Sequence, residues 1–227
     1  MSSLKKHLRL ASGQIVADVG AGTGIFTNLL LQSGYEVYAV EPNQEMREVA
    51  EHEFKSHNLF HSVYAPAEAT TLPDAGVDFI TAAQAFHWFD PQKVKVEFQR
   101  ILKPGGFVIL LWNERRQHGD PFHEVYEALI QKFGTDYNQV KHDNVRQKSV
   151  FQSFFAAGKY STKHFKNYQD FDFDGLCGRL LSSSYAPAKS HPNFEPMIKA
   201  LRKIFDKYAR EGHVRVTYDT KVYYGKL

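Results

Sequence analysis

The stretch Ile15–Asn43, IVADVGAGTGIFTNLLLQSGYEVYAVEPN, predicts the fold of this chain. Its first residues, 15–17, are the kind of short β-branched run found in strands that are buried on both faces. A glycine-rich turn, a helical pattern over 25–31 and a second strand over 36–40 follow, and Glu41 closes that strand. Strand, turn, helix and strand in this order predict a βαβ unit, which binds a nucleoside at the carboxyl ends of its parallel strands.

The spacing of the glycines indicates which nucleoside to expect. The dinucleotide fingerprint G-x-G-x-x-G would need one more glycine where this chain has Ile25 or Thr27. Asp18, just before the turn, would repel a pyrophosphate and suits a cationic ligand. A residue without a Cβ also permits positive φ and lets a ligand approach the backbone. The three alternating glycines are Gly20, Gly22 and Gly24.

The phrase DVGAGTG resembles the first motif of class I S-adenosylmethionine-dependent methyltransferases. The resemblance implies that the glycine turn passes under the methionine part of S-adenosyl-L-methionine and that Glu41 hydrogen-bonds both ribose hydroxyls. It implies a Rossmann-like α/β fold: a mostly parallel seven-stranded sheet with an antiparallel last strand and helices on both faces. The product would be S-adenosyl-L-homocysteine. The predicted cofactor-binding residues are Asp18, Gly20, Ala21, Gly22, Gly24, Glu41, Pro42, Met46, Ala67, Glu68 and Gln84.

Two of these residues have a second interpretation. Met46 lies about one turn into a helix that Asn43 caps, where it either touches the adenine or packs in the core together with Val49. Ala67 and Glu68 follow a weak third strand and match the family's adenine-edge position. The alternative interpretation of Glu68 is a solvated loop residue without a role in binding.

The fourth strand, 79–83, leads into the phrase AAQAFHWFD, which looks like small-molecule methyltransferases of the ubiquinone-biosynthesis and trans-aconitate type. Residues at this strand end face the ligand crevice in such sheets. Gln84 is predicted at the methionine end of the cofactor. His87 is predicted to act as a base or to orient the acceptor, or else to pack beside Trp88. The phrase lacks the N/D-P-P-Y/F motif of base-amine and glutamine methylation.

We interpret the whole chain, 1–227, as one methyltransferase domain. Residues 1–112 form the cofactor-binding half, 113–159 a lid or insertion, and 160–227 the strands and helices that complete the sheet. The segment 113–116 is predicted as a polar loop after a strand over 107–112, and the remaining elements are helices over 121–133, 173–184 and 194–210 and strands over 160–168 and 214–225. The predicted substrate-pocket residues are Trp88, Asn113 and Tyr185. The aromatic residues Phe151, Phe154, Phe155 and Tyr185 either line an apolar or planar acceptor or belong to the core.

Composition limits the alternatives. The chain has 227 residues, 43% of them hydrophobic, a net charge of +3 and one cysteine, Cys177. These values suit a reducing, cytoplasmic setting, and they make nucleic acid an unlikely partner and give no membrane segment. No metal site is predicted, because Asp90 and Glu114 are isolated. The remaining histidines, His123 among them, are expected at the surface, and the oligomeric state stays open.

Three functions remain open at this point. The first is methyl transfer to a small-molecule acceptor, with oxygen or a carboxylate favoured. The second is methylation of RNA or protein, and the third is cofactor binding without catalysis. The third is kept because similar methyltransferases carry one or two helices before the first strand that cover the cofactor. The short segment here means that the chain is trimmed at this end or that its site is unusually open.

Overall fold

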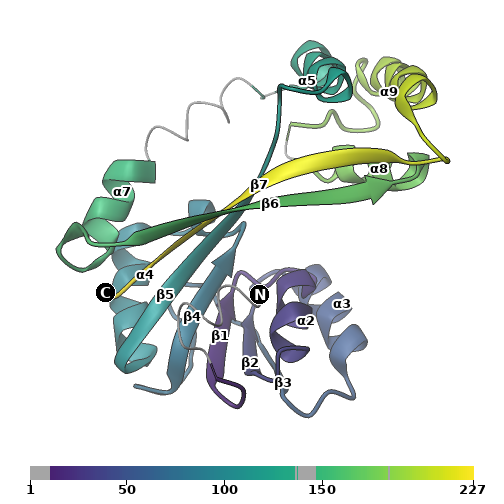
Figure 1. The fold of residues 1–227 in the computed structure, drawn as a ribbon. Coiled ribbons are helices and arrows are strands. Elements are labelled where there is room, and N and C mark those ends of the chain that lie inside the picture. The colour runs from purple at the N-terminus through teal and green to yellow at the C-terminus, as the bar shows by residue number, and fades with distance from the viewer. Residues whose placement is uncertain (1–10, 136, 138–146, 184) are drawn as a thin grey trace. The chain divides into compact units, whose positions relative to one another are not determined.

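The computed structural model describes residues 11–135, 137, 147–183 and 185–227, and contacts divide the chain into two compact units (Figure 1). Unit 1 comprises Met1–Trp112, Ser149–Lys163 and Lys221–Leu227. Unit 2 comprises Asn113–Lys148 and His164–Thr220. The three strands β5, β6 and β7 each contribute residues to both units.

The sheet has seven strands in the order β3-β2-β1-β4-β5-β7-β6. Four pairs of neighbouring strands are parallel: β1 with β2, β1 with β4, β2 with β3, and β4 with β5. The last strands are antiparallel, so the predicted α/β fold with a mostly parallel sheet is confirmed. The strands are β1 Ile15–Val19, β2 Glu36–Val40, β3 Phe60–Val63, β4 Val77–Ala83, β5 Leu102–Arg115, β6 Ser161–Phe171 and β7 Val214–Gly225.

Local capping residues fix where several helices begin. The Asn43 side chain accepts a hydrogen bond from the Met46 backbone N–H at 3.0 Å, as predicted, and Asp90 and Asp120 cap two later helices in the same way. The helices are α2 Ile25–Leu31, α3 Gln44–Phe54, α4 Pro91–Ile101, α5 Pro121–Phe133, α7 Gln147–Phe154, α8 Phe173–Leu181 and α9 Phe194–Tyr208, with 3₁₀ turns η1 Phe86–Trp88 and η3 Ala156–Gly158.

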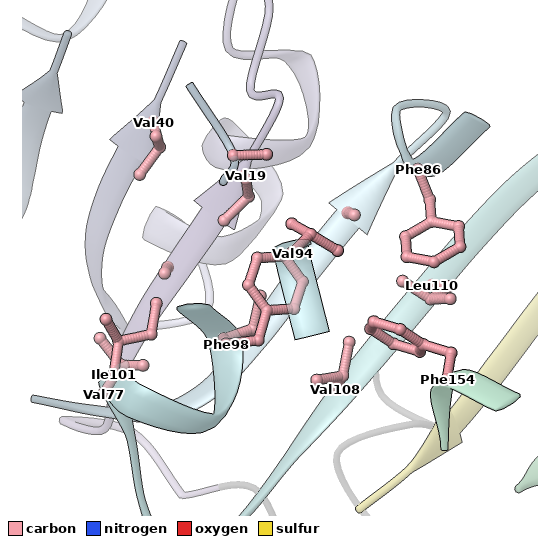
Figure 2. Packing of buried hydrophobic residues seen from close by; sticks show 14 of the residues in the cluster. Val19, Val40, Val77, Phe86, Val94, Phe98, Ile101, Val108, Leu110 and Phe154 are labelled. Atoms are coloured by element: carbon pink, nitrogen blue, oxygen red, sulfur yellow. The ribbon is translucent and has the colours of Figure 1, made fainter. Parts of the chain in front are cut away.

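The core of unit 1 lies between the sheet and α4. Figure 2 shows Val94, Phe98 and Ile101 of α4 among the inward side chains of β1, β4 and β5. Phe154 packs edge-on against Phe86, with ring centroids 4.7 Å apart. Three of the four aromatic residues that could have lined an acceptor pocket therefore belong to the core, because each is only 1% exposed. These are Phe151, Phe154 and Phe155.

The structure decides between the two interpretations of Met46 and corrects one strand boundary. Ile25 of α2 is 80% exposed, and Met46 and Val49 of α3 are 47% and 53% exposed, so these apolar side chains do not face the core. Thr27 takes an inward position on α2 instead, because its hydroxyl has a buried acceptor. The segment 113–115 is strand, not loop, since β5 continues to Arg115.

Unit 2 has its own core, made by α5, α8 and α9 with the unit-2 part of β7. The predicted bounds of α5 and β7 are confirmed residue for residue. In the part of the chain that the structure describes, no helix is long and apolar enough to span a membrane. The most deeply buried residues of this core include Tyr126, Ile130, Leu176, Leu180, Met197, Leu201, Val216 and Tyr218.

Candidate functional site

The three glycines of the turn after β1 have different surroundings. A Cβ on Gly20 would lie 2.4 Å from the Cβ of Ala85, and one on Gly24 would lie 2.5 Å from the ring of Phe54. A Cβ on Gly22 would meet nothing nearer than the Met46 Sδ at 4.0 Å. All three have positive φ. Gly20 and Gly24 are therefore required by packing, whereas Gly22 alone borders open space that a ligand can fill.

Glu41 holds the turn against the end of β2. Its Oε2 accepts the Gly22 backbone N–H at 2.8 Å, and its Oε1 accepts the Asn43 N–H at 2.9 Å. The side chain is 8% exposed. A carboxylate has about four acceptor positions, so each oxygen keeps capacity for a further donor. The arrangement fits a ligand that brings hydroxyl groups to the end of β2, as a ribose does.

Asp18 lies in the interior instead of at the surface of the turn. It is 1% exposed, and its two oxygens accept the hydroxyl hydrogens of Thr27 at 2.7 Å and Thr81 at 2.8 Å. Burial raises the pKa of Asp18 to about 6, although both hydroxyls oppose that shift. Asp18 therefore ties α2 and β4 to β1, and it acts on a ligand in the turn only through its field.

The other predicted residues of the turn and of α3 lie at the surface. Ala21 is half-buried, and its backbone N–H donates to the Val40 carbonyl at 3.2 Å. Pro42 is exposed beside Glu41, and Met46 is exposed with its sulfur turned toward Gly22. Of the two interpretations of Met46, the structure excludes the core methionine.

The loop after β3 is held by two carboxylates. Ala67 is 5% exposed, and the Oε1 of Glu68 accepts the Asp90 backbone N–H at 2.9 Å. Glu97 of α4 accepts both the N–H and the hydroxyl of Thr70, at 2.7 Å and 2.6 Å. Glu68 is therefore not a freely solvated loop residue, since it links this loop to the start of α4.

The turn after β4 carries Gln84, His87 and Trp88, all of them exposed. Gln84 has a φ of 59°, a left-handed conformation that is uncommon outside glycine and that often marks a functional turn. Its backbone N–H donates to the Leu111 carbonyl at 2.8 Å. The rings of His87 and Trp88 lie 5.1 Å apart, and Trp88 is 74% exposed.

The remaining predicted pocket residues belong to unit 2, whereas Trp88 belongs to unit 1. Asn113 accepts the Thr220 hydroxyl at 2.6 Å. The Tyr185 ring packs edge-on against Tyr137, with centroids 5.0 Å apart. The structure therefore does not bring the predicted acceptor residues together within one unit.

Sequence reasoning missed several buried polar residues, Thr27, Thr81 and His123 among them. Thr27 and Thr81 were not singled out, because a lone threonine in an apolar element carries no signal until its acceptor, Asp18, is placed. His123 was expected at the surface but is 1% exposed, and its Nε2 accepts the Thr217 backbone N–H at 2.9 Å. Its position on the inner face of α5, among Phe122 and Tyr126, is the signal that could have revealed it.

Comparison with known proteins identifies the domain. Residues 17–110, which span the glycine turn, Glu41 and the β4 end, match the family model described as a methyltransferase domain. This chain carries a methyltransferase domain. This match, together with the fold, supports a methyltransferase of class I, and methyltransferases of this family use S-adenosylmethionine.

Two curated relatives extend this finding. An uncharacterized methyltransferase of Mycobacterium bovis is 39% identical over 105 residues, which are 46% of this chain and 42% of that protein. A malonyl-[acyl-carrier protein] O-methyltransferase of Marinomonas is 32% identical over 161 residues, which are 69% of this chain and 57% of that protein. The matched part thus covers well under two thirds of either relative.

Solved structures show the same fold across the chain. A putative type II methyltransferase from Anaeromyxobacter dehalogenans has a TM-score of 0.70 and 24% identity, and the match covers 100% of this chain and 96% of that one. A phosphoethanolamine N-methyltransferase from Haemonchus contortus, solved with S-adenosylhomocysteine, has a TM-score of 0.52 and 15% identity. That match covers 100% of this chain and 52% of that one. At these identities the likeness concerns the fold.

Proposed function

We propose that this chain is an S-adenosylmethionine-dependent methyltransferase that acts on a small-molecule acceptor, at an oxygen or a carboxylate. The observation that carries the proposal is the hydrogen bond from the Gly22 backbone N–H to Glu41, which combines a hydroxyl-accepting carboxylate with the one glycine of the turn that borders open space. The methyltransferase domain over residues 17–110 contains both residues. Within class I we place the chain in the ubiquinone-biosynthesis and trans-aconitate subgroup on the phrase AAQAFHWFD.

The cofactor would supply a methyl group on a sulfonium: an acceptor nucleophile would bond to the methyl carbon in line as the carbon–sulfur bond breaks, with S-adenosylhomocysteine as the leaving group. Glu41 would accept the ribose hydroxyls, and the exposed Met46 would contact the adenine. The backbone at Gly22 would lie against the methionine part. Asp18, enclosed behind the turn, would favour a cationic ligand through its negative field once it is ionised.

The chain's own contribution to the chemistry is alignment and the exclusion of water, since a thioether leaves without a proton. A base is needed only where the acceptor must lose a proton. We assign that role, or the orientation of the acceptor, to His87, which follows the β4 end beside the glycine turn. The Marinomonas relative is named an O-methyltransferase, which supports an oxygen acceptor here.

The deciding experiment is calorimetric titration of S-adenosylmethionine and S-adenosylhomocysteine into the purified chain and two variants. Glu41→Gln removes the charge at the end of β2, and Glu45→Gln removes a nearby charge from the exposed first turn of α3. We expect micromolar binding that weakens at least tenfold, about 1.4 kcal/mol, in Glu41→Gln only. Binding that is absent, or equal in both variants, would refute the cofactor assignment.

Turnover separates the three functions. Conversion of S-adenosylmethionine to S-adenosylhomocysteine in the presence of small oxygen nucleophiles or carboxylates supports the proposal, and conversion only with RNA or protein favours the second function. Cofactor binding with no turnover of any acceptor favours the non-catalytic function. Where turnover occurs, His87→Ala should reduce kcat while leaving cofactor affinity unchanged. An unchanged kcat would remove the base role from His87.

A further inference from the structure

Unit 2 contains a cluster of arginine and tyrosine side chains that the proposed cofactor site does not use. We define the Arg–Tyr cluster as the eight residues Arg115, Tyr126, Glu127, Tyr137, Arg179, Ser183, Tyr185 and Tyr218. Its tyrosines Tyr126 and Tyr218 are each 2% exposed, and Glu127 is 3% exposed. All of these residues belong to one compact unit.

One arginine of the cluster is neutralised by the single carboxylate. Arg115, at the end of β5, forms an ion pair with Glu127 through Nη2 and Oε2 at 2.5 Å, and the two side chains are 9% and 4% exposed. Tyr137 donates its hydroxyl to the same carboxylate at 2.7 Å. Burial alone would raise the pKa of Glu127, but the hydrogen bonds from Tyr137, Arg115 and Gln131 lower it overall. Glu127 is therefore ionised and committed to Arg115.

The second arginine has no such partner. Arg179 of α8 donates from Nε to the Tyr218 hydroxyl at 3.3 Å and from Nη1 to the Ser183 hydroxyl at 3.1 Å. No carboxylate among the described residues pairs with it, and its Nη2 donates to none of them. Tyrosine and serine hydroxyls are neutral near pH 7, so they solvate the guanidinium without neutralising it.

The surroundings of Arg179 are tyrosine-rich and partly withdrawn from water. Burial would lower the pKa of Arg179, but Tyr218, Tyr185 and Tyr126 are close enough that their charges at high pH raise it overall. Tyr126 couples to Arg115 as well, because the Arg115 guanidinium lies 5.0 Å from its ring centroid. At neutral pH the cluster thus holds two guanidinium groups against one carboxylate.

A half-buried charge without a partner is costly, and an anion from outside the chain would offset that cost. We infer that Arg179, with the hydroxyls of Tyr218 and Ser183, binds the anionic group of a small molecule, a carboxylate or a phosphate. The guanidinium fork matches either group through two parallel N–H···O bonds. This inference goes beyond the proposed function, since it adds a binding site for an anionic small molecule within unit 2.

The test uses calorimetry on the full chain, with benzoate, phenyl phosphate and uncharged benzamide as probes. Each protein is first titrated with S-adenosylhomocysteine, and the probes are then added at a saturating level of it. Arg179→Gln removes the charge and the fork, and Arg179→Lys keeps the charge alone. Arg210→Gln is the matched control, because Arg210 is an exposed arginine of the same unit.

We expect benzoate or phenyl phosphate to bind wild type at least about tenfold more tightly than benzamide, as one charge-assisted contact provides. That advantage should disappear in Arg179→Gln, shrink in Arg179→Lys and persist in Arg210→Gln. The tighter of the two anions identifies a carboxylate or a phosphate as the recognised group.

Equal binding of benzoate, phenyl phosphate and benzamide to wild type would overturn the inference without any variant. An advantage that survives in Arg179→Gln would overturn it as well. The two proposals fail separately: loss of S-adenosylhomocysteine binding refutes the methyltransferase function, whereas anion binding through Arg179 is scored independently of that result.

Discussion

Substitution of Asp18 by asparagine tests how unit 1 tolerates a buried carboxylate. Burial raises the Asp18 pKa from 3.8 to about 6. A difference of about two pH units corresponds to ~3 kcal/mol at about 1.4 kcal/mol per unit. Because the folded pKa is the higher one, the stability that Asp18 contributes is complete below about pH 4 and is lost as the pH rises through about 6. At pH 7.5 the ionised Asp18 therefore opposes folding.

An asparagine at this position keeps the hydrogen bonds without the charge. Its Oδ1 can accept from one hydroxyl, Thr27 or Thr81, and its Nδ2 can donate to the oxygen of the other. We therefore expect Asp18→Asn to unfold with a free energy up to ~3 kcal/mol higher than wild type at pH 7.5, and with no gain at pH 4. The gain appears between these two values, in the window in which Asp18 ionises.

The assay is urea unfolding of wild type and Asp18→Asn at several pH values, with hydrogen exchange of the β1 and β4 amides to report on unit 1. Asp74→Asn is the control, because the Asp74 side chain is 81% exposed. A ¹³C titration of the Asp18 carboxyl measures its pKa directly. A carboxyl that titrates near 4, or a stability difference that does not change with pH, would refute the reasoning.

Two further outcomes follow from the geometry of the turn and of α5. Gly22→Ala should weaken S-adenosylhomocysteine binding in calorimetry and lower the free energy of unfolding in urea by about 1 kcal/mol, because alanine is strained at positive φ. Gly24→Ala should lower the free energy of unfolding by more, because its Cβ would lie 2.5 Å from the Phe54 ring. The reverse ranking of the two stabilities would contradict this account. Burial lowers the pKa of His123; Asp120 opposes this shift, and two nearby arginines add to it. The stability that the neutral His123 contributes to the fold is therefore complete above about pH 6.5 and is lost as the pH falls. Hydrogen-exchange protection of the Thr217 amide should therefore decrease from pH 7 to pH 5, and His123→Gln should flatten that decrease; an identical decrease in both proteins would show that His123 is not its source.

The parts of the fold that the sequence predicts well are those with local causes. Asp120, Pro121 and Gly134 bound α5 through capping and backbone preferences that need no distant partner. The βαβ unit is predicted for the same reason, because its turn, helix and strand lie within thirty residues of one another. The alternation of apolar and polar residues over 214–225 was enough to predict β7.

The rest depended on partners far away in the sequence. Nothing local indicates that β5 continues through Asn113 to Arg115, since the continuation comes from pairing within the sheet. Periodicity indicated that Phe151 and Phe154 share a face but not which surface they cover. In the candidate site, Glu41 was found from its position at a strand end, whereas the enclosure of Asp18 depends on a hydroxyl from β4, 63 residues away.

The path of the chain through the two units has a consequence for its synthesis and its diversification. Most of unit 1 is synthesised before unit 2, but unit 1 also includes Lys221–Leu227. All of unit 2 is therefore synthesised before unit 1 is complete. The chain crosses between the units after Trp112, Lys148, Lys163 and Thr220. Exchange of unit 2 between homologous genes would thus need several coordinated breakpoints. Unit 2 is then expected to diversify through point substitutions, and not through recombination of a single cassette.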